Sequence, residues 1–201
     1  VDGAKVSGEG AVAGTLNLGT SGGADLHVNA ATTAGSLSGG TVNLAGTNFV
    51  YLDVLPTTSG PFTVLSYTTL ASGDETNFQV QPAGAYRGNP EVQHDIANSQ
   101  FTLELDSQAR TWNNTALTGN WNTTDLNWVE GDNLFFNGDD VAFTDTAVGT
   151  VNLGTGLQPL SITLSNTSGN DYTFAGGSII GTTGISMNGG GALTLGGTNT
   201  Y

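Results

Sequence analysis

The stretch Gly-Thr-Leu-Asn-Leu-Gly at residues 14–19 decides the fold, because it recurs along the chain. It returns as Gly-Thr-Val-Asn-Leu-Ala-Gly at residues 40–46, as Gly-Thr-Val-Asn-Leu-Gly at residues 149–154 and, more loosely, as Gly-Ala-Leu-Thr-Leu-Gly at residues 191–196. Apolar and polar residues alternate in each copy, which predicts a short strand with two apolar side chains on one face. The first two copies begin 26 residues apart. Repetition at this spacing is typical of a solenoid, in which one turn cannot bury its apolar face alone.

The predicted fold class is all-β: a right-handed parallel β-helix, or β-solenoid, with an irregular Trp-rich junction. Runs of glycine, as at residues 176–177 and 189–191, mark the corners between strands. Glycine suits a corner because its backbone adopts positive φ without a Cβ clash. The absence of long helical periodicity excludes alternating strand–helix architectures. A Gly-rich β-sandwich is the alternative fold.

The pattern divides the chain into two parts. Residues 1–110 are predicted to form solenoid rungs with a looser connecting region at about 56–100, where Pro56 and Pro61 interrupt any central strand. Within that region, residues 62–67 are predicted to form a strand and residues 81–99 an irregular or hairpin-like segment. Residues 111–201 are predicted to form a Trp-containing junction followed by further rungs.

The charge balance limits the partners. Seventeen acidic residues face three basic ones, Lys5, Arg87 and Arg110, giving a formal net charge of −14. Nucleic acids and anionic membrane surfaces attract lysine and arginine, so the sequence predicts neither as a partner. Charged residues make up only 10% of the chain, against roughly 25% in typical soluble domains. The polar surface is therefore expected to consist mainly of Thr, Ser and Asn.

Other classes are excluded by what the sequence lacks. There is no cysteine, which removes disulfides, thiolate zinc sites and cysteine nucleophiles. No run of about 18 apolar residues is present, so no direct membrane insertion is predicted. The chain starts at Val1 without a methionine or an apolar leader. We interpret it as a mature or excised piece, or an internal segment, of a longer protein.

The acidic residues of the junction suggest a calcium site, because Ca²⁺ prefers six to eight oxygen ligands. The candidate ligands are Glu130, Asp132, Asp139, Asp140 and Asp145. No EF-hand spacing or tandem calcium-binding repeat accompanies them. The alternative is that Asn-Gly-Asp-Asp at residues 137–140 forms a turn whose side chains bind the local backbone. No other cofactor is indicated.

The junction also holds all three tryptophans: Trp112, Trp121 and Trp128. One hypothesis is that they stack on sugar rings, which would make the chain a carbohydrate-binding adhesin module with surface polysaccharide as its partner. The favoured alternative is that they fill a local core where the solenoid is interrupted, with their indole N–H groups finding acceptors.

Catalysis is not predicted. Paired acids on a β-helix suggest a polysaccharide lyase or glycosidase, which places two carboxyl groups about 5 to 10 Å apart. A lyase of that type also needs a lysine or arginine nearby, and the three basic residues are scattered along the sequence. His27 and His94 sit in no nucleophile motif such as Gly-x-Ser-x-Gly, so each is expected to be an ordinary surface or half-buried residue.

Several of these motifs together resemble a known family, the autotransporter-associated β-strand repeat, also called the passenger-associated transport repeat. The matching elements are Thr-Trp at 111–112, Gly-Asn-Trp at 119–121, Asn-Trp at 127–128, Asn-Gly-Asp-Asp-Val-Ala-Phe at 137–143 and the Gly-rich segment at 189–201 that closes on Asn-Thr-Tyr. The match covers about the last ninety residues well, and residues 49–105 more loosely.

The resemblance implies a parallel β-helix in a large bacterial surface or secreted protein, with a structural or adhesive role, no enzyme activity and no catalytic residue. Both ends of this chain look like cuts through a solenoid. Because the end of a β-helix leaves backbone groups unpaired, we expect self-association through the solenoid ends or contact with neighbouring modules, outside the cell.

Overall fold

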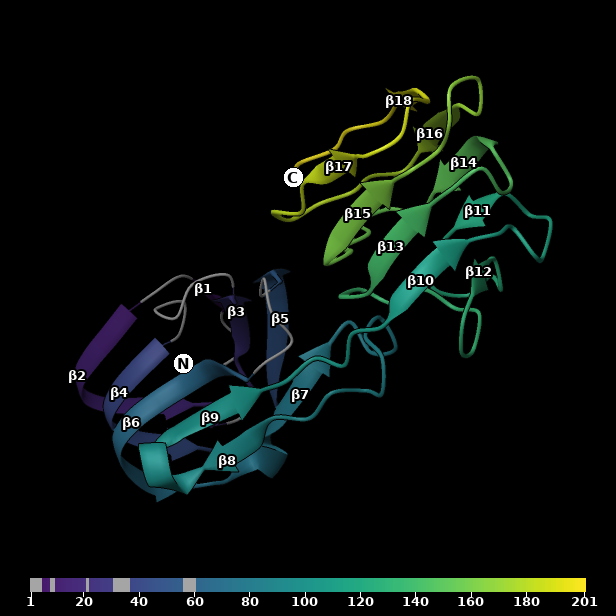
Figure 1. Cartoon of the computed structure of the whole chain (residues 1–201). Coiled ribbons are helices and arrows are strands. Elements are labelled where there is room, and N and C mark those ends of the chain that lie inside the picture. The colour runs from purple at the N-terminus through teal and green to yellow at the C-terminus, as the bar shows by residue number, and fades with distance from the viewer. Residues whose placement is uncertain (1–4, 8–9, 21, 31–36, 56–60) are drawn as a thin grey trace. The chain divides into compact units, whose positions relative to one another are not determined.

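The computed structural model describes residues 5–7, 10–20, 22–30, 37–55 and 61–201. It confirms the all-β prediction: parallel strands stack into a β-solenoid of about six turns, and the sandwich alternative is not formed. The chain divides into two compact units, residues 1–105 and residues 106–201, each with its own strands (Figure 1).

In the described part of the first unit, two sheets form the walls of the solenoid. One sheet is parallel throughout and consists of β1 (Lys5–Ser7), β3 (Asp25–Asn29), β5 (Asn48–Val54) and β7 (Phe78–Gln81). The other begins with three parallel strands, β2 (Gly10–Leu18), β4 (Leu37–Leu44) and β6 (Phe62–Ser72), and continues with two antiparallel strands, β9 (Gln100–Leu103) and β8 (Gln93–Asp95). Two short 3₁₀ helices, η1 (Glu75–Asn77) and η2 (Ile96–Asn98), lie between the later strands.

The second unit repeats this arrangement. One sheet has the order β12 (Trp128–Val129), β10 (Ala109–Trp112), β13 (Asp140–Phe143), β15 (Ser161–Leu164) and β17 (Ile185–Met187), and only the β12–β10 pair is antiparallel. The other sheet is parallel and consists of β11 (Asn120–Trp121), β14 (Gly149–Leu153), β16 (Tyr172–Gly176) and β18 (Leu193–Leu195).

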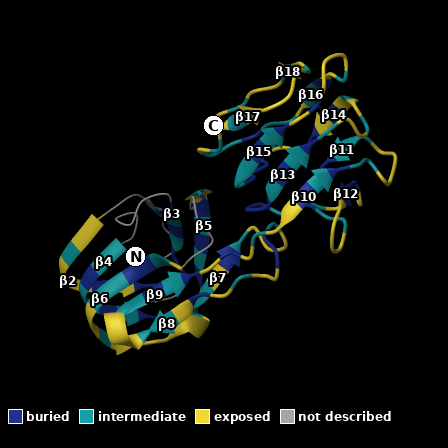
Figure 2. Cartoon of the chain, viewed as in Figure 1, coloured by how far each residue is buried: buried dark blue, intermediate teal, exposed yellow. Residues whose placement is uncertain are grey.

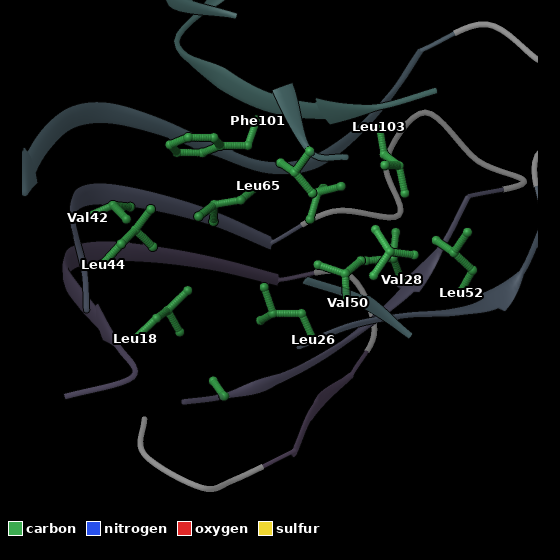
Figure 3. Close-up of a cluster of buried hydrophobic side chains, with 14 of the residues drawn as sticks. Leu18, Leu26, Val28, Val42, Leu44, Val50, Leu52, Leu65, Phe101 and Leu103 are labelled. Carbon is green, nitrogen blue, oxygen red and sulfur yellow. The ribbon is translucent and has the colours of Figure 1, made fainter. Parts of the chain in front are cut away.

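The first two copies of the repeated stretch occupy equivalent places on successive coils. Leu16 and Leu18 of β2 pair in register with Val42 and Leu44 of β4. All four side chains are buried, and the labelled side chains of Figure 3 show how both sheets of this unit point apolar groups into one core. The strands are amphipathic because each has one face toward this core and one toward solvent (Figure 2).

Two boundaries differ from the sequence prediction. The units separate after Leu105, whereas the prediction placed the border between residues 110 and 111. Strand β10 begins at Ala109, so Arg110 and Trp112 lie on one strand of the second unit. In the connecting region, β6 continues to Ser72, beyond the strand predicted at residues 62–67, while the antiparallel β8–β9 pair agrees with the hairpin-like alternative.

An asparagine closes the corresponding corner in both units. Asn48 Oδ1 accepts from the backbone N–H of Ala24, at 3.0 Å, while its Nδ2 donates to the carbonyl groups of Ala45 and Asn77. Asn199 does the same in the second unit: Oδ1 accepts from Ile179 N–H and Nδ2 donates to Gly196 O, both at 2.9 Å. Each asparagine follows Gly-Thr, and that glycine has positive φ, 56° at residue 46 and 79° at residue 197. The side chain therefore satisfies backbone groups of the neighbouring coil where the ladder turns.

We expect Asn48→Ala to lower the free energy of unfolding by about 1–3 kcal/mol, because it leaves a buried backbone N–H without an acceptor. Asn199→Ala should have a smaller effect in the same direction, since Asn199 is only partly buried. Urea denaturation followed by circular dichroism measures both. Asn43→Ala is the control: its side chain bonds Asn17 on the solvent-exposed face, and its effect should stay within about 0.5 kcal/mol. Equal losses at Asn43 and Asn48 would contradict the assigned role of the corner.

Candidate functional site

The three tryptophans meet inside the second unit. Trp112, Trp121 and Trp128 come from β10, β11 and β12, and all three side chains are buried. The Trp128 ring lies edge-on to both others, with ring centroids 5.2 Å from Trp112 and 5.4 Å from Trp121, and Phe143 packs against all three. A sugar platform needs an exposed ring face, and these rings offer none. They fill the core beside the first coil of the unit, and the sugar-stacking hypothesis does not fit them.

Only one of the three indole N–H groups has a hydrogen-bond acceptor within the described residues. Trp112 Nε1 donates to the Ala147 carbonyl at 3.2 Å, whereas Trp121 Nε1 and Trp128 Nε1 are buried without a partner. The expectation that each indole would find an acceptor therefore holds for Trp112 alone. The aromatic contacts of Trp121 and Trp128 stabilise the core despite these unmade bonds.

A buried arginine lies beside this aromatic core. The Arg110 side chain is fully enclosed; Nη1 donates to the Glu130 carbonyl and Nη2 donates to Gln108 Oε1 at 2.8 Å. Nη2 also forms an ion pair with Asp132 at 3.0 Å, and Nε lies 3.6 Å from Asp139 Oδ2. The basic residues are scattered along the sequence, but folding brings two junction carboxylates to Arg110. This role of Arg110 was not predicted, although Arg110 and Trp112 alternate on one strand and so share its inward face.

Asp139 and its neighbours join three successive coils. Asp139 is buried and accepts backbone hydrogen bonds from Gln108, on the preceding coil, and from Phe136. Asn137 Oδ1 accepts from Gln158 N–H at 2.9 Å, and Asp140 accepts from the Ser161 hydroxyl, both donors being on the following coil. The Asn-Gly-Asp-Asp segment thus forms the expected turn, and it also fixes the register between coils.

The predicted calcium ligands do not converge. Within the described residues, no group of three or more acidic, histidine or cysteine side chains is placed to hold a metal ion. Glu130 accepts from the N–H and hydroxyl of Thr111, and Asp145 accepts from the N–H and hydroxyl of Thr167, so these two acids bind separate segments. Asp132 and Asp139 face the Arg110 guanidinium, a permanent cation that already compensates their negative charge.

Asp125 organises the loop between β11 and β12, a role that sequence analysis did not assign to it. Its carboxylate accepts from the Thr118 hydroxyl at 2.6 Å and from Asn120 Nδ2 at 3.0 Å. These hydrogen bonds, that of Thr118 first, hold the pKa of the Asp125 carboxyl below its ordinary value. Asn127 completes the loop by donating to Thr118 Oγ1 and to the Asn120 carbonyl.

Both histidines are half-buried, as expected, and each pairs with a neighbour. His27 Nδ1 lies 2.7 Å from Asp53 Oδ1, and its ring stacks on Tyr51 with centroids 4.8 Å apart. His94 Nε2 lies 2.5 Å from the Tyr67 hydroxyl. Within the described residues, the hydrogen-bond partners of the two rings are the Asp53 carboxylate and the Tyr67 hydroxyl, not a serine or threonine hydroxyl.

Within the described residues, no helix is long and apolar enough to cross a membrane.

Replacing Arg110 should strongly destabilise the second unit. Arg110→Met leaves Asp139 buried without its counter-ion, and we expect the free energy of unfolding to fall by about 3–5 kcal/mol. Adding Asp139→Asn to that variant should restore part of the loss. Asp132→Asn is the matched control: the Asp132 side chain is 44% exposed, and its loss should amount to no more than about 1 kcal/mol. Urea denaturation followed by tryptophan fluorescence reports on this unit, because all three tryptophans belong to it.

Acid should weaken the junction loop through Asp125. Because its folded pKa is lowered, the unfolded chain takes up the proton first as the pH falls. The stabilisation is therefore present above the ordinary Asp pKa of about 4 and disappears as the pH falls through the folded value. Asp125→Asn should lower Tm at pH 7 and flatten the fall of Tm below about pH 4. Asp106→Asn, at an exposed position, controls for the loss of one negative charge. A wild-type pH profile in Asp125→Asn would refute this role.

Compared with known proteins, the chain matches no protein-family model, no curated protein and no solved structure.

Proposed function

We propose that the chain is a non-enzymatic structural module of an extracellular bacterial surface or filament-forming protein, and that copies of it associate through the edge formed by β17 and β18. The observation that carries this proposal is the exposure of inward-facing apolar side chains on that coil. Assignment outside the cell rests on the resemblance to passenger-associated repeats and on the lack of cysteine.

Two columns of inward-facing side chains show the change. Phe143 and Leu164 are buried, but Met187, the next residue in the same column, is 43% exposed. Val151 and Phe174 are buried, but Leu195, which follows them, is 44% exposed. Among the described strands, none pairs with the outer side of β17 or β18. This edge therefore combines unpaired backbone groups with exposed apolar side chains, the two features that favour strand addition.

The occupant that fits this edge is β2 of a second copy. Strand β2 is also at the edge of its sheet, and its sequence contains no charged residue. Strands β17 and β18 are uncharged as well, although the chain carries a net charge of −14. Edge strands that must stay apart commonly carry lysine or another charge, and these three do not. A parallel pairing of β2 with one of these two strands extends one wall of the solenoid from one copy to the next. Such a contact joins different surfaces of the two copies and extends as a chain unless its rotation closes a ring.

Association should depend on Met187 and Leu195. Sedimentation velocity over a range of concentrations should show species larger than a monomer for the wild-type chain, and mostly monomer for Met187→Asp/Leu195→Asp, because carboxylates at the edge oppose burial. The variant should retain the wild-type Tm within a few degrees, since both side chains are already largely exposed.

Leu117→Asp is the matched control for added charge, because Leu117 is 85% exposed on a loop away from the edge strands. It should associate as the wild type does. A wild-type chain that stays monomeric at high concentration, or a control that dissociates as fully as the edge variant, would overturn the proposal.

A further inference from the structure

The first unit contains a cavity that none of the features described above involves. It has a volume of about 460 Å³ and is bounded by η1, β7 and the loop of residues 82–92. Its buried floor is apolar and includes Val80, Tyr86 and Val92, with Phe78 partly exposed beside them. Volume and lining both fall within the range of small-molecule sites, which are mostly apolar with a few polar groups at defined places.

The charged groups of the cavity are both carboxylates. Glu75 and Glu91 are exposed at its rim, and the described lining contains no lysine, arginine or histidine. At the rim, His94 Nδ1 lies 3.9 Å from Glu75 Oε2. Glu91 has no side-chain hydrogen bond or ion pair among the described residues. Burial raises the pKa of Tyr86 to about 12, so its hydroxyl is neutral near pH 7 and adds no third negative charge.

The walls of the cavity are held in place by the protein itself. At the start of η1, Asp74 Oδ1 accepts from Thr76 N–H, and Asn77 Oδ1 accepts from Asp74 N–H, which makes a capping box. Asn77 Nδ2 also donates to Gly46 O, which ties η1 to the neighbouring coil. In the loop of residues 82–92, Ala85 N–H donates to the Pro82 carbonyl and closes a turn. The shape therefore exists before any ligand arrives, which lowers the entropy lost on binding.

We propose that this cavity binds a small organic cation: an amine or guanidinium group on an apolar stem, with the stem over the Val80–Tyr86–Val92 floor and the charge between Glu75 and Glu91. Charge decides the class. An anion is repelled by both carboxylates and by the net charge of the chain, whereas a neutral apolar molecule gains only the apolar contacts with the floor. A cation on an apolar stem gains both the apolar contacts with the floor and the Coulomb attraction of two carboxylates that have no strong counter-ion. This proposal is independent of the association edge and of the proposed structural role.

The test compares three probes of one shape and different charge: phenethylamine, 2-phenylethanol and phenylacetate. Titration calorimetry with the full chain at low ionic strength should show phenethylamine binding at least tenfold more tightly than 2-phenylethanol, and phenylacetate not binding. Tryptophan fluorescence is unsuitable here, because the tryptophans all lie in the other unit. Saturation-transfer NMR should show contact between the bound phenyl ring and the protein.

Glu75→Gln/Glu91→Gln should weaken phenethylamine binding at least tenfold and leave 2-phenylethanol unchanged. The matched control, Glu104→Gln/Asp106→Asn, removes the same charge at exposed positions outside the cavity lining and should bind phenethylamine as the wild type does. Equal affinity for the amine and the alcohol, no measurable binding of the amine, or an equal loss in the control variant would each overturn the proposal.

Discussion

The in-register stacking of neighbouring coils is the constraint on which the other features depend. A coil here contributes only a few inward side chains, such as Leu26 and Val28 from β3, and these are buried because Val50 and Leu52 of β5 lie directly beside them. The backbone obeys the same rule, since each parallel strand finds its hydrogen-bond partners on the adjacent coils. At the corners, where the ladders end, asparagine side chains supply the missing partners. Stability is therefore shared between neighbours and does not belong to any single coil.

The buried arginine shows how this constraint is met where the stacking restarts. At the first coil of the second unit, β10 has only the short antiparallel β12 on its outer side. Trp112, Trp121 and Trp128 cover the apolar core there, and Arg110 is enclosed beside them with carbonyl, amide and carboxylate partners. Pairing makes the burial of this charge tolerable, but each partner must then be held in place. The Asn-Gly-Asp-Asp turn does so by bonding to the coils on both sides.

The repeated short motifs carried enough information to predict the solenoid, because alternation and glycine corners are local properties. The packing of the tryptophans was also within reach as the favoured alternative. The convergence of Arg110 with Asp132 and Asp139 could not be predicted in the same way, because these residues are separated by one coil. The predicted domain border also fell within β10 and so separated Arg110 from the junction. The cavity was missed for a similar reason. Residues 81–99 have no periodic pattern, and the facing wall of the cavity is η1, which Asn77 ties to Gly46 on a neighbouring coil.

Charge is distributed unevenly over the described residues, so different faces of the molecule repel a second copy to different degrees. Carboxylates project from its flanks, as at Asp53 and Asp171, while β2, β17 and β18 are neutral. Two such molecules repel one another electrostatically when their acidic faces meet. This repulsion is absent when their neutral edge strands meet. Screening in about 0.1 M salt shortens the repulsion to roughly 10 Å, comparable to the spacing of packed sheets. If copies associate through these edges as proposed, ionic strength sets whether the resulting threads stay separate or gather laterally into bundles.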